Sequence, residues 1–196
     1  MRIKIFLSLF ILFLSSAAQA KTLIESLSLC DSTFFNQMNK KKELKKIISA
    51  SNANNIKTAK DVGVDVNRLQ DSGVTIVKYL NQYANLDKYG EYYFWGFQLE
   101  EDLATAHERL SQYIELKKSR GLFQHNTLIK RVGDTSWKIN LGATDGVAPA
   151  PSTMEKLLIL EEVNGKTNVL CSIQGTVTAE DLLDIRPDLR TVINEK

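Results

Sequence analysis

Tyr-Gly-Glu-Tyr-Tyr-Phe-Trp-Gly-Phe, residues 89–97, contains six aromatic side chains in nine positions. Aromatic residues favour β-strands, in which successive side chains point to opposite faces. One face of such a strand would carry Tyr93, Trp95, Phe97 and Leu99. Because Leu99 also begins an apolar pattern with helical spacing, we expect this face to pack against a helix and to belong to the core.

The opposite face of this strand is mixed in character. It carries Tyr92 and Phe94 together with Gly96 and Gln98. Flat aromatic rings give a binding surface a large contact area with little loss of conformational entropy. We therefore name Tyr92 and Phe94 as candidate ligand-binding residues. The alternative is a structural role, with this face covered by the N-terminal helix.

The first 20 residues have the three parts of a secretory signal peptide. Arg2 and Lys4 give a basic start, an apolar run covers residues 5–14, and Ala18-Gln19-Ala20 provides small residues at the expected cleavage site. The uncharged stretch from residue 5 to residue 20 is shorter than the roughly 20 apolar residues that a membrane-spanning helix needs. We expect cleavage after Ala20 and a periplasmic or secreted chain, residues 21–196, with no stable membrane insertion.

Removal of the signal peptide changes the charge of the protein. The 196-residue chain has 25 basic and 23 acidic residues, a formal charge of +2. Loss of 20 residues leaves 176, and loss of Arg2 and Lys4 leaves 23 basic against 23 acidic residues, a formal charge of zero. Nucleic-acid binding depends on a basic surface, so we expect no nucleic-acid partner. The lysine-rich run at residues 39–46 is expected to be a solvated helix face, with contact to anionic lipid or polysaccharide as the alternative.

Cys30 and Cys171 are the two cysteines of the chain. An even number of cysteines in an exported protein favours pairing, and two cysteines allow one intramolecular disulfide. Such a bond would span most of the chain, for which chain-entropy arguments give a stabilisation of about 4–5 kcal/mol. The alternative is a pair of buried thiols.

Apolar spacing and turn residues predict the elements of the first half. Apolar residues recur every three or four positions from Leu23 to Met38, which predicts a long N-terminal helix that buries Cys30 and ends near residues 51–55. Alternation at residues 62–66, turn residues at 71–73 and apolar residues at 74–80 predict a hairpin. A central helix is predicted to begin at the acidic residues 100–102 and to end at Gly121.

The second half predicts further hairpins. Residues 127–132 and 136–140 have the pattern of short strands, and Asn164-Gly165 predicts a type I′ turn between strands at 156–163 and 166–175. Thr178 and Asp181 predict a capped helix that ends before Pro187. We therefore predict one α+β domain, residues 21–196, in which an antiparallel sheet of hairpins packs against a long N-terminal helix, a central helix and a short C-terminal helix.

Sequence signatures of catalysis are missing. The chain has no Gly-x-Ser-x-Gly motif and no Gly-rich phosphate loop, and His107 and His125 belong to no metal-binding spacing. We therefore expect no catalytic residue, no metal site and no cofactor.

The loop from residue 140 to residue 152 is the one segment whose length suggests binding, because long ordered loops often carry it. Its Asp145, with His125 and Trp137 on nearby segments, completes the set of candidate ligand-binding residues. The leading hypothesis is a non-enzymatic exported protein that binds an envelope component or a protein partner. The alternative is a small envelope hydrolase that uses His125 or Asp145 at this loop.

Overall fold

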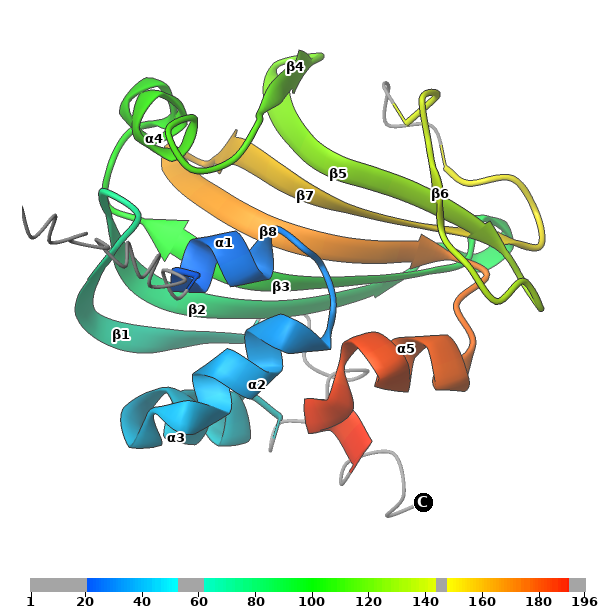
Figure 1. Cartoon of the computed structure of the whole chain (residues 1–196), viewed down its shortest axis with the longest axis horizontal. Coiled ribbons are helices and arrows are strands. Elements are labelled where there is room, and N and C mark those ends of the chain that lie inside the picture. Colours follow the sequence, from blue (N-terminus) through cyan, green and yellow to red (C-terminus); the bar gives the residue numbers. More distant parts are fainter. Residues whose placement is uncertain (1–20, 53–61, 144–147, 191–196) are drawn as a thin grey trace, which may run out of the picture.

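The computed structural model describes residues 21–52, 62–143 and 148–190, so the expected signal peptide and Asp145 lie outside the described residues. As predicted, the fold is α+β with an antiparallel sheet (Figure 1). The helices are α1 (Leu23–Leu27), α2 (Ser32–Lys40), α3 (Lys42–Asn52), α4 (Leu103–Leu110) and α5 (Ala179–Ile185), with short 3-10 helices η1 (Asp87–Tyr89) and η2 (Pro187–Leu189). The strands are β1 (Val62–Asp71), β2 (Val74–Asn85), β3 (Glu91–Leu99), β4 (Lys117–Ser119), β5 (Leu122–Arg131), β6 (Lys138–Ile139), β7 (Thr153–Val163) and β8 (Lys166–Gly175).

The sheet is built from hairpins in the order β1-β2-β3-β8-β7-β5-β4, and β6 pairs with β5. Two-residue turns close three of these hairpins, at Ser72-Gly73, Arg120-Gly121 and Asn164-Gly165. Both residues of each turn have positive φ, which is the signature of a type I′ turn and matches the twist of the strands. The predicted hairpins at residues 62–80 and 156–175 are therefore confirmed.

The predicted long N-terminal helix is instead three short helices. α1 ends at Leu27, and Cys30 has φ 47°, which a right-handed helix does not accept. Asp31 then begins α2, because its side chain accepts a hydrogen bond from Thr33 N at 2.8 Å. Lys41 is extended and separates α2 from α3. The apolar spacing continues across both breaks because all three helices bury side chains in the same core.

The predicted central helix is also shorter than expected. Asp102 caps α4 by accepting a hydrogen bond from Thr105 N at 2.8 Å, so the acidic start is confirmed. The helix ends at Leu110, however, and residues 117–119 form β4. Gly121, with φ 89°, closes the β4–β5 hairpin instead of ending a helix. A glycine after basic residues suits either role, which is why the sequence pattern misplaced this boundary.

The core lies between one face of the sheet and the helices, with α1, α2, α3 and α5 on the same side (Figure 1). The predicted core row of β3 is confirmed, since its four side chains are at most 2% exposed: Tyr93, Trp95, Phe97 and Leu99. Phe34 and Phe35 of α2 pack on this row, with ring centroids 5.6 Å from Phe97 and 6.1 Å from Trp95, respectively. Within the described ranges, no helix has the length and apolar character needed to cross a membrane.

The predicted disulfide between Cys30 and Cys171 is present, with a Cα–Cα distance of 5.5 Å. Cys30 lies in the turn between α1 and α2, and Cys171 lies opposite Trp95 on the central strand β8. The bond therefore joins the N-terminal helices to the middle of the sheet.

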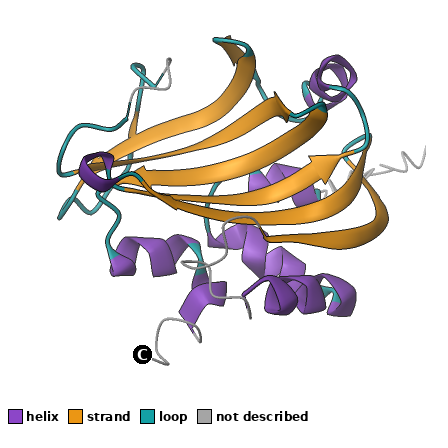
Figure 2. Ribbon diagram, turned by 180° about the vertical axis from the view of Figure 1, so that it is seen from behind, coloured by secondary structure: helices purple, strands orange, loops and turns teal. Residues whose placement is uncertain are grey.

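The other face of the sheet is seen in Figure 2, where the strands lie in front of α1. Tyr92 and Phe94 are half-buried on this face, with ring centroids 6.4 Å apart. The N-terminal helices pack on the opposite face, so they do not cover these two rings. Leu80, Leu157 and Leu170 are buried on the same face as the two rings, outside the main core.

Candidate functional site

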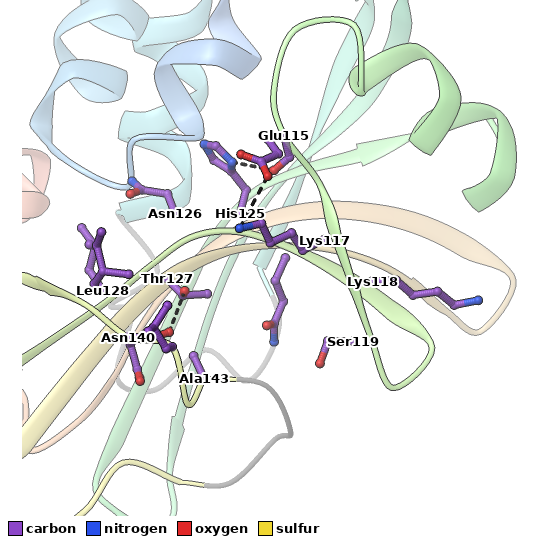
Figure 3. Close-up of a pocket in the computed structure, with 13 residues that line it drawn as sticks. Glu115, Lys117, Lys118, Ser119, His125, Asn126, Thr127, Leu128, Asn140 and Ala143 are labelled. Atoms are coloured by element: carbon purple, nitrogen blue, oxygen red, sulfur yellow. Dashed lines mark hydrogen bonds and ion pairs between the residues drawn. The ribbon is translucent and has the colours of Figure 1, made fainter.

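An open pocket of about 310 Å³ lies where β4, β5 and β6 meet at one edge of the sheet (Figure 3). Polar and charged side chains form most of its wall: Glu115, Lys117, Lys118, Ser119, Gln124, His125, Asn126, Thr127 and Asn140. Apolar side chains complete it: Leu128, Ile139, Leu141 and Ala143. The pocket therefore includes the predicted residue His125 and the beginning of the predicted loop at 140–152.

An irregularity in β5 shapes the inner wall of the pocket. Strand pairing with β7 shifts between His125 and Leu128, and Asn126 has φ 52°. A β-bulge of this kind bends a strand and redirects its side chains. Here the Asn126 side chain donates a hydrogen bond to the Leu29 carbonyl at 3.2 Å, which fixes the bulge to the turn between α1 and α2.

His125 is oriented by a main-chain carbonyl. Its Nδ1 lies 2.7 Å from Glu115 O, and since a carbonyl oxygen can only accept, Nδ1 carries the proton (Figure 3). Nε2 is then the ring nitrogen with a free lone pair, which can accept a hydrogen bond or a proton from a ligand.

Asn140 fixes the start of the loop beside β5. Its main-chain N donates to Thr127 O at 2.9 Å, and Thr127 Oγ1 donates to Asn140 O at 3.0 Å. The Asn140 side chain donates to Glu155 Oε1 at 2.6 Å and accepts from Gly142 N at 3.1 Å. The mouth of the pocket is therefore held by hydrogen bonds, although it belongs to a loop.

The rim of the pocket is unusually apolar for a surface. Leu141 is 88% exposed and Ile139 is 73% exposed, and no other large apolar side chain among the described residues is as open to solvent. Both side chains line the pocket, next to its hydrogen-bonding wall. An exposed apolar patch beside polar groups is typical of a surface that contacts another molecule.

The charged groups of the pocket are one carboxylate and two ammonium groups, beside neutral polar side chains. Lys117 Nζ lies 3.5 Å from Glu115 Oε1, and both side chains are exposed. Lys118 adds a second exposed ammonium group to the same wall. The arrangement suits a partner with apolar atoms that contact the rim. The same partner would place hydrogen-bonding groups, acceptors more often than donors, against the wall.

Trp137 does not line this pocket and is half-buried beside the core. Its ring centroid is 4.9 Å from Lys156 Nζ and 5.6 Å from Lys130 Nζ. Burial lowers the pKa of Lys156, the nearby Asp31 carboxylate opposes that shift, and Lys130 adds to it. Lys156 also donates to Cys30 O at 3.2 Å, so this lysine anchors the α1–α2 turn.

The structure thus separates the candidate residues. His125 lines the pocket, Trp137 lies beside the core, and Tyr92 and Phe94 lie on the face of the sheet opposite to the N-terminal helices. Sequence reasoning did not identify the pocket-lining residues of β4 or the exposed side chains of Ile139 and Leu141. The available signal for β4 was Arg120-Gly121, a pattern that fits a hairpin turn as well as a helix end.

Comparison with known protein families, with curated proteins and with solved structures finds no match for this chain. Over the described ranges, no group of three or more His, Cys, Asp or Glu side chains is arranged to hold a metal ion.

Proposed function

We propose that the chain is an exported, non-enzymatic protein of the periplasm or the extracellular space that binds an envelope component or protein partner at the β4–β5–β6 pocket. One observation carries the proposal: Leu141 and Ile139 are 88% and 73% exposed at the rim of a pocket whose wall is polar. A partner that covers these two side chains would remove apolar surface from water, which is the main favourable term in protein association.

The compartment in this proposal is supported by two observations. The Cys30–Cys171 disulfide is of the kind that persists in oxidising compartments and is rare in the cytosol. The first 20 residues have the composition of a secretory signal peptide.

The experiment compares partner capture by three forms of the oxidised chain, residues 21–196. We expect the wild-type protein to retain a defined component of an envelope extract and Leu141→Asp to lose it by at least about tenfold, because a charge at the rim opposes apolar contact. Val163→Asp is the matched control, since Val163 is also exposed but lies in the β7–β8 hairpin. A retained component is then purified and its affinity measured directly. Equal retention by Leu141→Asp and Val163→Asp would remove the pocket from the proposal.

The alternative function is a small envelope hydrolase, favoured by the basic Nε2 that the Glu115 carbonyl leaves on His125. The hydrolysis of 4-nitrophenyl esters of increasing chain length separates the two functions. We expect wild-type and His125→Ala proteins to show the same slow rate. A loss of about a hundredfold or more in His125→Ala, with an unchanged melting temperature, would favour the hydrolase, because that is the size expected for removal of a general base.

A further inference from the structure

A second hollow lies between α3 and β1, at the edge of the sheet opposite to the pocket. This groove encloses about 660 Å³. Its floor is apolar and comes from both elements: Leu44, Ile47, Val64, Val66 and Leu69. Among the described strands β1 pairs with β2 alone, so the sheet ends at the groove.

Lysines border the helix side of the groove. Residues 40–46 contain five lysines and one acidic residue, all of them exposed. Lys46 pairs with Glu43 at 3.2 Å, whereas the other two lysines that line the groove, Lys41 and Lys42, form no ion pair within the described residues. On the β1 side, Asp65 lies 3.5 Å from Lys78 Nζ. The charge that has no partner along the groove is therefore positive.

We propose that the groove binds an acidic amphipathic segment of a partner protein. Carboxylates of the segment would meet Lys41 and Lys42, and its apolar side chains would cover Ile47 and Val64 on the floor. Opposite charges select the partner and accelerate the encounter, while burial of apolar area supplies affinity. The overall formal charge of the chain after residue 20 is zero, so this local excess of lysine is a property of the groove and not of the whole surface.

The shape of the site favours a protein segment over a lipid bilayer. Proteins that lie on a bilayer insert apolar side chains that project from their surface. At the groove the apolar side chains are recessed: Leu44 and Val66 are at most 9% exposed, and Ile47, Val64 and Leu69 are half-buried. The large apolar side chains that do project, such as Leu86 and Leu141, lie elsewhere. A narrow segment can reach the floor of the groove, whereas a flat bilayer cannot.

The groove and the β4–β5–β6 pocket have no lining residue in common. Variants in one site therefore leave the other intact, and either proposal can fail while the other stands.

The test uses the oxidised chain, residues 21–196, and a fluorescein-labelled peptide made of three Glu-Glu-Leu-Leu repeats. Fluorescence anisotropy is measured with this peptide and with two comparison peptides, in which Lys replaces Glu or Ser replaces Leu. We expect the acidic amphipathic peptide to bind at least about tenfold more tightly than either comparison peptide, and its affinity to fall as salt screens the charges.

Three variants locate the binding site. Lys41→Glu with Lys42→Glu, and separately Ile47→Ser, should each weaken binding of the peptide by about tenfold or more. Lys88→Glu with Lys166→Glu is the matched control, because both lysines are exposed, lie outside the groove and change the net charge by the same amount. Melting curves confirm that each variant is folded.

Equal loss of binding in the Lys41/Lys42 and Lys88/Lys166 variants would overturn the proposal. A second result would also overturn it: no binding of the peptide, together with binding of phosphatidylglycerol vesicles that is lost in the Lys41/Lys42 variant. Those lysines would then bind a membrane surface.

Discussion

Arg186 shows how a single residue fixes the C-terminal elements to the sheet. It is fully buried, and its guanidinium carbon lies 4.7 Å and 5.2 Å from the ring centroids of Phe35 and Trp95. Its nitrogens donate to both carboxylate oxygens of Asp188 at 3.0 Å and 2.8 Å, and to Asn81 Oδ1 on β2 at 3.1 Å. One side chain therefore connects η2, α2 and two strands.

Removal of this guanidinium should destabilise the protein strongly. Arg186→Met leaves the Asp188 carboxylate, whose side chain is 2% exposed, without a counter-charge. Breaking one partner of a buried ion pair typically costs about 3–5 kcal/mol, and we expect a loss of that size in the free energy of unfolding by urea. Adding Asp188→Ala should recover part of the loss. A change below about 1 kcal/mol in the single variant would show that this ion pair does not hold the fold.

Glu155 gives the protein a dependence on pH. Burial raises the pKa of its carboxyl, although hydrogen bonds from Gln174 and Asn140 act in the opposite direction. Because the pKa in the folded protein exceeds the ordinary value of 4.5, ionisation favours the unfolded chain, and stability falls as the pH rises through these two values. Burial raises the pKa of Glu161 as well, which adds a contribution of the same sign.

Glu155→Gln should remove the Glu155 contribution. We expect the free energy of unfolding of Glu155→Gln, relative to wild type, to be more favourable at pH 7 than at pH 4, as measured by urea unfolding at each pH. Glu180→Gln serves as the control because Glu180 is exposed on α5. If the free energy of unfolding of Glu155→Gln, relative to wild type, stays constant or declines as the pH rises, the raised pKa of Glu155 is contradicted.

The turn between α1 and α2 is attached to three strands of the sheet. Cys30 is bonded to Cys171 of β8, the Cys30 carbonyl accepts from Lys156 of β7, and the Leu29 carbonyl accepts from Asn126 of β5.

We expect the double substitution Cys30→Ala with Cys171→Ala to reduce the free energy of unfolding by up to about 4–5 kcal/mol. Dithiothreitol should lower the urea midpoint of the wild type and leave that of the variant unchanged. Equal midpoints for the oxidised wild type and the variant would exclude a stabilising tether.

The pairing of β3 with β8 depends on Gly96. It has φ 153°, and a Cβ at this position would lie 2.2 Å from Val169 O on the neighbouring strand. Gly96→Ala should therefore cost more than about 1 kcal/mol in urea unfolding, since an alanine at positive φ is already unfavourable without a clash. Gly133→Ala is the matched control, with φ 89° and open space around the added atom. If both variants lose the same stability, the close approach of the strands carries no cost.

At this scale the sequence predicts hairpins better than helix boundaries. Asn164-Gly165 supplies two residues suited to positive φ, so the turn, and with it the strands on either side, follows from local chemistry. The helix boundary at Cys30 does not follow from local chemistry. Its φ of 47° accompanies a tertiary disulfide, for which the neighbouring residues give no signal. The site divides in the same way. His125 could be named from its residue type, whereas its orientation depends on a main-chain carbonyl and the exposure of Leu141 depends on how the whole edge is arranged.

In the whole molecule, the two proposed contact sites lie at opposite edges of the sheet, and the floor of the groove includes Leu44 and Val66 of the main core. The helix-covered face of the sheet contains the main core, the disulfide and the buried Arg186. Tyr92 and Phe94 lie on the face opposite to the N-terminal helices. Because the two sites share no lining residue and lie at opposite edges, we expect variants in the two sites to be independent of each other in stability.

Export and oxidation give one prediction for the complete chain. The 196-residue chain, produced in a bacterium with a general secretory pathway, should yield a periplasmic protein that begins at Lys21. Intact-mass spectrometry should give a mass two hydrogen atoms below that of the reduced chain, because the disulfide has formed. The same chain without residues 1–20, made in the reducing cytoplasm, should contain free Cys30 and Cys171 and melt at a lower temperature, because the unfolded state is then no longer cross-linked. Oxidation of that cytoplasmic protein in vitro should raise its melting temperature to the value of the exported form. A chain that retains residues 1–20 in the membrane fraction would instead indicate an anchor.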